Sequence, residues 1–153
     1  SAVDAVISLF HVVSYQTTDD DVNAMFATAA AHLAPGGLFF FDVWYGPAVL
    51  HEKPERRVKE LEDEDYKITR VATPTLHSER RVVDVHYALT AINKKNNATS
   101  STEEVHHMRY FTTPELQSFA ENSGFALADA HAWMTREQPG PSTWGVSFVC
   151  KKR

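Results

Sequence analysis

Apolar residues change their spacing along the first 45 positions of the chain. Residues 3–10 form an almost continuous apolar run, which predicts a strand. The next apolar positions recur at helical spacing and predict a helix with one apolar face: Val22, Met25, Phe26, Ala29, Ala30 and Leu33. The run 38–41 then predicts a second strand, buried on both faces as in a parallel sheet. Together these elements predict a right-handed βαβ unit.

Particular residues mark where the predicted helix begins and ends. Thr17 and Thr18 precede three aspartates. Threonine hydroxyls accept hydrogen bonds from the first free amides of a helix, and acidic groups suit its positive end. At the other end Pro35 cannot continue a helix, and residues 36–37, both glycine, allow a tight reversal into the second strand.

The apolar period becomes two between residues 56 and 111, after a loop marked by Pro47 and Pro54. This alternation predicts four strands, at residues 58–62, 66–71, 81–93 and 103–111. Polar reversals separate them at residues 62–65, around Pro74 and His77, and at residues 94–101. The pattern predicts an antiparallel sheet with one packed and one solvated face, inserted at residues 46–111.

The α/β pattern resumes after residue 111. Thr112 and Glu115 predict a helix start, and Gly124 predicts its end. Residues 125–133 and 143–151 then predict two strands joined by a loop that contains no helix. We expect these two strands to pair antiparallel and to close the sheet. The predicted α/β core comprises residues 1–45 and 112–153 of a single partial domain spanning residues 1–153.

Composition narrows the class of protein. The chain has 153 residues, of which 43% are hydrophobic, and a net charge of -5. It has no basic cluster and no run as long as a transmembrane helix, so neither nucleic acid nor a membrane is a predicted partner. The single cysteine, Cys150, excludes an internal disulfide, and no signal peptide is visible, so we expect a cytoplasmic protein. Because a strand begins at once after Ser1, we expect a truncated or partial domain.

Ligand-binding side chains are expected beyond the carboxyl ends of parallel strands. After the second strand come Asp42, Trp44 and Tyr45, which could face a ligand or could equally cap the next turn and cover the core. His11 and Tyr15 follow the first strand in the same way, where an ordinary surface histidine is an equally good interpretation.

The last strand of the insertion places His107 and Arg109 on one face. Together they could bind a polar or anionic acceptor, although a solvated pair on a sheet face is the favoured interpretation. Trp144 begins the final strand, near the same rim. The eight histidines include no His-x-His or His-Glu-x-x-His spacing, and no cysteine pair exists, so no metal site is predicted.

Four stretches carry a resemblance to a known family: VDAVISLFHVVSYQTTDDD, HLAPGGLFFFDVWY, HHMRYFTTPELQSFAENSGF and PSTWGVSFVCKK. They resemble the fourth strand with its loop, the fifth strand, the lead into a late helix, and the terminal reversed strand of class I S-adenosylmethionine-dependent methyltransferases. The second stretch is the most specific. The antiparallel insertion resembles that of the subgroup that methylates sugars, amino sugars and other small polar molecules.

This resemblance implies the second half of a Rossmann-like sheet, with the insertion as a substrate lid or platform. It implies S-adenosylmethionine as cofactor and methyl transfer to a small polar acceptor. The residues expected to contact the cofactor are Leu9, Phe10 and His11. The residues expected to act in catalysis are His11, Tyr15 and His107. The residues expected to bind the acceptor are Asp42, Trp44, Tyr45, Arg109 and Trp144.

The sequence also departs from the family pattern. The six glycines form no Gly-rich first turn, and the acid that holds the cofactor ribose has no counterpart. We therefore expect this chain alone to be an inactive half-enzyme, and its first strand to present an apolar edge that recruits a second copy, giving a homodimer. Two alternatives remain: a non-catalytic fragment acting as a binding or dimerisation module, or half of another Rossmann-like enzyme such as a dehydrogenase, which the helix-free final pair disfavours.

Overall fold

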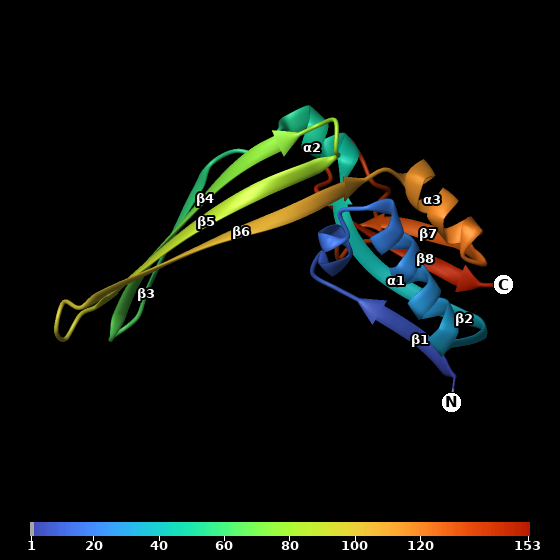
Figure 1. Cartoon of the computed structure of the whole chain (residues 1–153), viewed down its shortest axis with the longest axis horizontal. Helices are drawn as coiled ribbons and strands as arrows, with labels where there is room; N and C mark the ends of the chain where they lie inside the picture. The colour runs from blue at the N-terminus through green and yellow to red at the C-terminus, as the bar shows by residue number, and fades with distance from the viewer. Residues whose placement is uncertain (1) are drawn as a thin grey trace. The chain divides into compact units, whose positions relative to one another are not determined.

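The computed structural model describes residues 2–153, which divide into two compact units. Of the described residues, 2–53 and 108–153 belong to the α/β unit, and residues 54–107 form the β unit. In chain order the elements are β1 (Val3–Ser8), η1 (Val12–Tyr15), α1 (Asp19–His32), β2 (Leu33–Tyr45), α2 (Gly46–Glu52), β3 (Arg57–Glu62), β4 (Tyr66–His77), β5 (Val82–Asn93), β6 (Thr99–Phe111), α3 (Thr113–Asn122), β7 (Phe125–Ala132) and β8 (Gly145–Lys152). Figure 1 labels them along the ribbon.

Strand pairing over residues 2–153 connects eight strands into one open sheet. The order is β3-β4-β5-β6-β2-β8-β7, and β1 pairs with β2. The architecture is a mixed α/β fold with a Rossmann-like sheet, as predicted. No helix within residues 2–153 has both the length and the apolar character needed to cross a bilayer.

The α/β unit contains the predicted βαβ arrangement. β1 and β2 run parallel, with Val6 opposite Phe39 and Ser8 opposite Phe41, and α1 connects them. β8 runs antiparallel to β2, and β7 runs antiparallel to β8. The parallel pair and the reversed, helix-free pair at the end of the chain are therefore confirmed.

Both long helices of this unit begin with the predicted caps. The Thr18 hydroxyl accepts a hydrogen bond from the Asp21 amide at 3.1 Å, at the start of α1. Thr112 and Glu115 form a capping box at the start of α3. Figure 1 shows the two helices on the same side of the strands of the α/β unit.

The core of the α/β unit lies between these helices and the sheet. Phe26 of α1 makes edge-to-face contacts with Phe39, Phe41 and Phe125, at centroid distances of 5.6, 5.7 and 5.9 Å. All four side chains are almost completely buried. Such aromatic pairs add about 0.5–1.5 kcal/mol each beyond the burial of their area. The phenylalanines of the predicted second strand therefore anchor α1.

The opposite face of β2 is only partly covered, so the prediction that both faces are buried is wrong. Leu38 is 42% exposed and Phe40 is half-buried. The physical reason lies in the helices: within the described residues, α1 and α3 both pack on the side of Phe39 and Phe41.

The glycines before the apolar run of β2 form a bulge rather than a reversal. Val3 pairs with Leu33 and Ala5 pairs with Leu38, so residues 34–37 of β2 lie opposite a single residue of β1. Gly36 has φ +79°, a conformation that favours glycine. A Cβ on Gly37 would lie 2.9 Å from the backbone oxygen of Ala34, so a larger residue would not fit there. The chain therefore enters β2 directly from α1.

Residues 46–52, predicted as part of a loop, form the short helix α2. Pro47 lies in its first turn, where the missing amide hydrogen is not needed. Ala48 and Val49 are fully buried. Packing of two small apolar residues therefore forms a helix that is too short to show a helical pattern in the sequence.

The β unit is an antiparallel sheet, as predicted, with β4 paired to both β3 and β5. The predicted packed face is present only in part, because Val83 and Val85 of β5 are buried whereas all residues of β3 are exposed. β4 continues through Pro74 to His77, so the reversal predicted there lies at residues 78–81 instead. Pro74 is tolerated because it lies beyond Ala72, the last residue of β4 that pairs with β3. β6 also begins four residues earlier than predicted.

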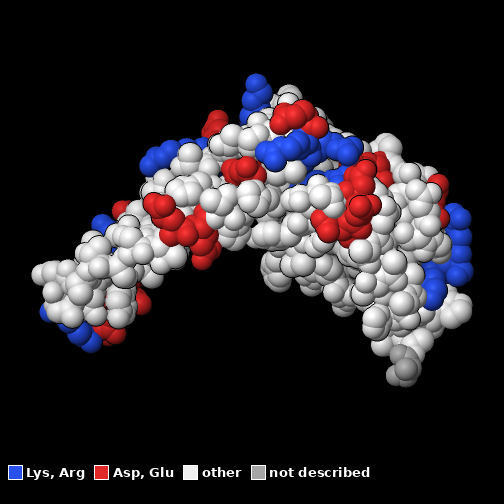
Figure 2. All heavy atoms as spheres, in the orientation of Figure 1, with Lys and Arg blue, Asp and Glu red and all other residues white. Residues whose placement is uncertain are grey.

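The boundaries of the β unit are narrower than the predicted insertion at residues 46–111. α2 and the last four residues of β6 belong to the α/β unit. There Tyr110 pairs with Trp44 and Phe111 pairs with Tyr45 in parallel register. On the face shown in Figure 2, basic and acidic side chains are interspersed rather than gathered into a field of one sign.

Candidate functional site

The loop that follows β1 has a strained backbone. Phe10 and His11 are consecutive residues with φ of 63° and 61°, a conformation that L side chains seldom adopt. Each such residue costs about 1–3 kcal/mol, and strained residues of this kind cluster at functional sites. The loop lies at the carboxyl end of a parallel strand, where α/β folds bind ligands.

A buried carboxylate inside β2 holds this loop; Asp42, Trp44 and Tyr45 were expected after the second strand, but β2 continues through all three because Asp42 and Trp44 pair with β8. Asp42 is fully buried, and its Oδ2 accepts a hydrogen bond from the backbone amide of His11 at 3.0 Å. The same oxygen lies 2.7 Å from Nδ1 of the His11 ring, without good hydrogen-bond alignment, while Oδ1 has no hydrogen-bond partner among the described residues. Asp42 was predicted to bind the acceptor, but the contacts it makes here are to His11.

The ring of His11 is confined on two further sides. Its centroid lies 6.3 Å from that of Trp133, at the end of β7. A Cβ on Gly145 would lie 3.3 Å from Cε1 of His11 and 3.2 Å from Cβ of Trp133. The His11 side chain remains 32% exposed, so the ring is held in place and is still accessible.

Sequence reasoning missed Trp133 and Gly145, although the topology contains a signal for them. β7 and β2 both run antiparallel to β8, so β7 ends at the same edge of the sheet as β2. A tryptophan directly after β7 therefore belongs to the same rim. Ser14, whose Oγ accepts from the Trp44 amide at 3.0 Å, has no comparable signal in the sequence.

Two tryptophans form a corner next to this loop. The ring centroids of Trp44 and Trp144 are 5.9 Å apart, and the angle between the two ring planes is 89°. The indole Nε1 of Trp144 donates a hydrogen bond to Oε2 of Glu52, at the end of α2. Aromatic faces combined with a carboxylate suit a cationic group. The structure thus brings together two predicted acceptor residues and adds Glu52, which was not predicted.

The other predicted residues of the α/β unit differ in exposure. Phe10 is 77% exposed and lies in edge contact with Trp133, and Leu9 is half-buried. Tyr15 is an exposed residue of η1. The hydroxyl of Tyr45 lies 3.2 Å from Oγ1 of Thr113, so this tyrosine links β2 to α3.

Arg109 is buried, so the expectation of a solvated side chain is wrong. Its Nη2 donates to Oδ1 of Asp19 at 2.7 Å and to Oε1 of Glu115 at 2.6 Å. The guanidinium also lies over the rings of Phe111 and Phe119. These contacts join β6 to α1 and α3 and give Arg109 a structural role.

His107 has different partners from Arg109, and the two do not act as a pair. In the β unit, Nδ1 of His107 lies 2.6 Å from Oδ1 of Asp84, and Nε2 of His77 lies 3.0 Å from Oδ2 of the same carboxylate. The hydrogen bond from His107 is the main reason why the pKa of Asp84 lies below its usual value. Asp84 thus bridges two histidines across neighbouring strands.

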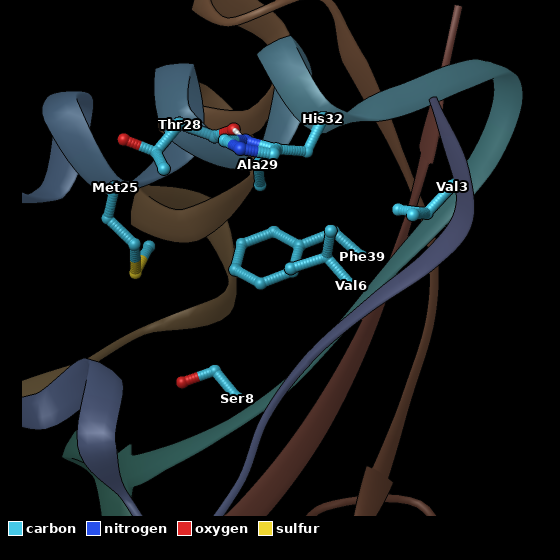
Figure 3. Close-up of a pocket in the computed structure, with 8 residues that line it drawn as sticks. All are labelled: Val3, Val6, Ser8, Met25, Thr28, Ala29, His32 and Phe39. Carbon is cyan, nitrogen blue, oxygen red and sulfur yellow. Dashed lines mark hydrogen bonds between the residues drawn. The ribbon is translucent and has the colours of Figure 1, made fainter. Parts of the chain in front are cut away.

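A cavity of about 440 Å³ lies between α1 and β1 (Figure 3). Val6, Met25 and Phe39 line it with apolar groups, and Ser8 lies at one end. His32 is the titratable residue of its lining, with Nδ1 2.8 Å from the Thr28 carbonyl oxygen. The lining suits an apolar group and offers little chemistry for proton transfer.

Cys150 is a poor candidate for a reactive group, and the described residues contain no candidate metal site. The Cys150 thiol is buried in the core, which raises its pKa to about 12 and makes it a poor nucleophile. Within residues 2–153, no three side chains among His, Cys, Asp and Glu converge in a way that could hold a metal ion.

Solved methyltransferase structures share this architecture. A structure of an S-adenosylmethionine-dependent methyltransferase from Clostridium acetobutylicum matches 99% of the chain at 14% identity, with a TM-score of 0.82. DesVI of Streptomyces venezuelae matches at 20% identity and a TM-score of 0.78. CalS10, an amino pentose methyltransferase from Micromonospora echinaspora with bound S-adenosylmethionine, matches at 22% identity and a TM-score of 0.76.

The likeness is one of fold rather than of close sequence. The chain covers 58%, 59% and 59% of these three proteins, while 99% of the chain is matched in each. No protein-family model matches the sequence, and no curated protein matches it. The reversed final pair, the parallel βαβ unit and these structural matches establish that the chain has a class I S-adenosylmethionine-dependent methyltransferase-like fold.

Proposed function

We propose that the protein transfers a methyl group from S-adenosylmethionine to a small polar acceptor, such as a sugar or an amino sugar. The observation that carries this proposal is the position of His11 and its neighbours. They lie at the carboxyl edge of a sheet whose fold is that of S-adenosylmethionine-dependent methyltransferases.

The residues at this edge fit part of such a cofactor. S-adenosylmethionine supplies a methyl group on a positively charged sulfonium, whose charge disperses during transfer. The backbone of residues 9–11 would hold the methionine part of the cofactor. The face of Trp133 lies beside that backbone and would tolerate the positive charge.

The corner of Trp44 and Trp144 supports a polar or cationic acceptor. Their perpendicular rings and the adjacent Glu52 suit an amine or a sugar ring. KedS8, a solved structural match at 16% identity, is described as a sugar N-methyltransferase. We therefore favour an amine as the acceptor group, with a hydroxyl group as the alternative.

Within this proposal His11 takes the proton that the acceptor loses, because its ring is accessible and stands at the rim. Tyr15 and Tyr45 remain candidates for contacting the acceptor or the cofactor. His107 remains a candidate proton acceptor on the β unit. Arg109 is assigned to structure rather than to acceptor binding, because its side chain is buried and its Nη2 donates to two carboxylates.

The test is methyl transfer by the natural full-length protein. Purified protein receives S-adenosylmethionine with a labelled methyl group and a panel of amino sugars, neutral sugars and simple amines. We expect label in the amino-sugar fraction and a large loss with His11→Ala. His32→Ala, an exposed histidine at the end of α1, is the matched control and should keep the activity.

A non-catalytic binding or dimerisation module is the second candidate, and one observation favours it. β1 pairs with β2, and Ile7 on it is 63% exposed while Val3 is 44% exposed. An apolar strand of this kind can add a strand from another chain. If the full-length protein transfers no label to any acceptor and self-associates through β1, this second function replaces the first.

A further inference from the structure

We propose that Asp42 is a positioning residue that holds His11 with its proton on Nδ1, so that Nε2 faces the acceptor as a proton acceptor. This inference rests on the proposed methyl transfer, and it assigns a task to a buried carboxylate that touches neither reactant. The contacts of Asp42, the loop conformation and the confinement of the ring each support it.

The first argument is the strained loop. Phe10 and His11 adopt positive φ, and the structure must offset that cost. The hydrogen bond that the His11 amide donates to Oδ2 of the fully buried Asp42 offsets this cost. Ser14 adds a second restraint, because its amide donates to the His11 carbonyl at 2.9 Å and its Oγ accepts from the Trp44 amide. The loop is thus held from β2 at two points.

The second argument is the tautomer of the ring. Nδ1 of His11 lies 2.7 Å from a carboxylate oxygen without hydrogen-bond alignment, and the negative charge of that carboxylate favours a proton on the nearer ring nitrogen. The lone pair of the neutral ring then lies on Nε2. Because the side chain is 32% exposed, a reactant at the rim can approach the ring.

The third argument is that the ring cannot readily turn over. The backbone of Gly145 passes so close that a Cβ there would lie 3.3 Å from Cε1 of His11. Trp133 stands on another side at 6.3 Å between ring centroids. Neither neighbour carries a charge, so Asp42 is the charged group in contact with the ring among the described residues.

The arrangement accounts for each proton and electron pair. As the acceptor nitrogen or oxygen forms its bond to the methyl carbon, the carbon–sulfur pair returns to sulfur, and the acceptor proton passes to Nε2 of His11. The ring is then positively charged beside a fully buried carboxylate. Asp42 stabilises that charge, which lowers the cost of the proton transfer.

The decisive experiment compares Asp42→Asn with the unaltered full-length protein. Asn retains an oxygen that accepts from the His11 amide, so the loop is kept. The same oxygen then stands beside Nδ1 without a negative charge, so the variant keeps the contact and removes the charge that favours a proton on Nδ1 and stabilises the protonated ring. Asp129→Asn is the matched control, because Asp129 is an exposed aspartate 3.6 Å from another histidine, His131.

Nitrogen-15 NMR of labelled histidine reads the tautomer without requiring activity. We expect the Nδ1–H form of His11 in the unaltered protein and in Asp129→Asn, and a shift towards the Nε2–H form in Asp42→Asn, where the charge is lost. We also expect kcat to fall by about 10²–10⁴-fold in Asp42→Asn, with the KM for S-adenosylmethionine nearly unchanged. His11→Ala should cost as much as the double variant, because the two residues act as one unit.

Two results would overturn the inference. One is an Nε2–H ring in the unaltered protein, which can be observed even if the variant does not fold. The other is an equal kcat in Asp42→Asn and the unaltered protein. A full-length protein that holds the Nδ1–H form but methylates no acceptor would instead contradict the proposed function, so the two failures are distinguishable.

Discussion

Nη2 of Arg109 lies 2.6 Å from Oε1 of Glu115, joining the last residues of β6 to the first turn of α3. The arginine side chain is 2% exposed and that of Glu115 is 12% exposed, so this ion pair lies largely out of water. Asp19 of α1 contacts the same nitrogen at 2.7 Å. One buried guanidinium therefore holds two helices against a strand that continues into the β unit.

Removing this guanidinium should destabilise the α/β unit. We expect Arg109→Ala to lower the free energy of unfolding by about 3–5 kcal/mol, because it leaves a carboxylate buried without its counter-charge. Arg109→Lys should have an intermediate effect, since a lysine keeps the charge but not the planar fork. Urea unfolding followed by circular dichroism measures both. A change below 1 kcal/mol in Arg109→Ala would contradict the structural role.

The bridge of Asp84 predicts a loss of stability in acid. The hydrogen bond from His107 and the charges of His107 and His77 hold the pKa of Asp84 below its usual value of 3.8. The carboxylate therefore contributes stability above pH 3.8 and loses it as the pH falls through the lower, folded-state value. Arg80, which lies 3.9 Å from Asp84, and Glu79, which lies 3.9 Å from His77, are further charged groups at this turn, as is Arg81.

Unfolding at several pH values tests this bridge. The stability difference between the unaltered protein and Asp84→Asn should be largest above pH 5 and should shrink below pH 4. Carbon-13 NMR of the Asp84 carboxyl group provides the direct measurement. If the titration midpoint of the Asp84 carboxyl group lies at or above pH 3.8, the bridge does not hold the carboxylate in its charged form.

Two glycines near the rim should respond differently to alanine. Gly145→Ala places a Cβ 3.2 Å from Cβ of Trp133 and 3.3 Å from Cε1 of His11, so these groups must move. We expect a loss of about 1–3 kcal/mol in stability and a lower rate of methyl transfer. Gly140→Ala is the control, because its Cβ would meet Oγ1 of Thr143 at an ordinary 3.8 Å. Equal behaviour of the two variants would argue against a crowded ring of His11.

The edge of β1 predicts self-association of the 153-residue chain. Ile7 is 63% exposed on a strand that pairs with β2, and we expect dimers that join two such edges. Light scattering should show a dimer at micromolar concentration, and Ile7→Lys should convert it to a monomer. Val58→Lys on β3, another exposed position, is the matched control and should leave the dimer intact. A stable monomer of the unaltered chain would refute the prediction.

The 153-residue chain should bind S-adenosylmethionine weakly. The sequence contains no Gly-rich turn of the kind that cradles this cofactor in the resembling family, and the chain covers about three-fifths of its structural matches. We expect a Kd weaker than about 1 mM, which corresponds to about -4 kcal/mol. Isothermal titration calorimetry of the chain measures this Kd, and a value in the micromolar range would contradict the prediction.

The sequence by itself determined the fold class and most of the elements. The helical period of residues 22–33 and the apolar run at residues 38–41 specify α1 and β2, because burial of one helix face and of a strand leaves a local pattern. The alternation after residue 56 specifies an antiparallel sheet for the same reason. It also placed His11 after the first strand, where a parallel sheet collects its ligands, whereas Asp42, expected after the second strand, lies inside β2 opposite Ser147.

Only the tertiary structure decided which of these side chains meet. Asp42 and His11 are 31 residues apart, and no local pattern reveals that one lies buried behind the other. The burial of Arg109 depends on carboxylates from two helices, one of them 90 residues away in the sequence. Local periodicity reports which face of an element is buried, whereas partners distant in the sequence are brought together by the packing of the elements. For that reason the candidate residues could be named from the sequence, but the division between the site and the supporting structure could not.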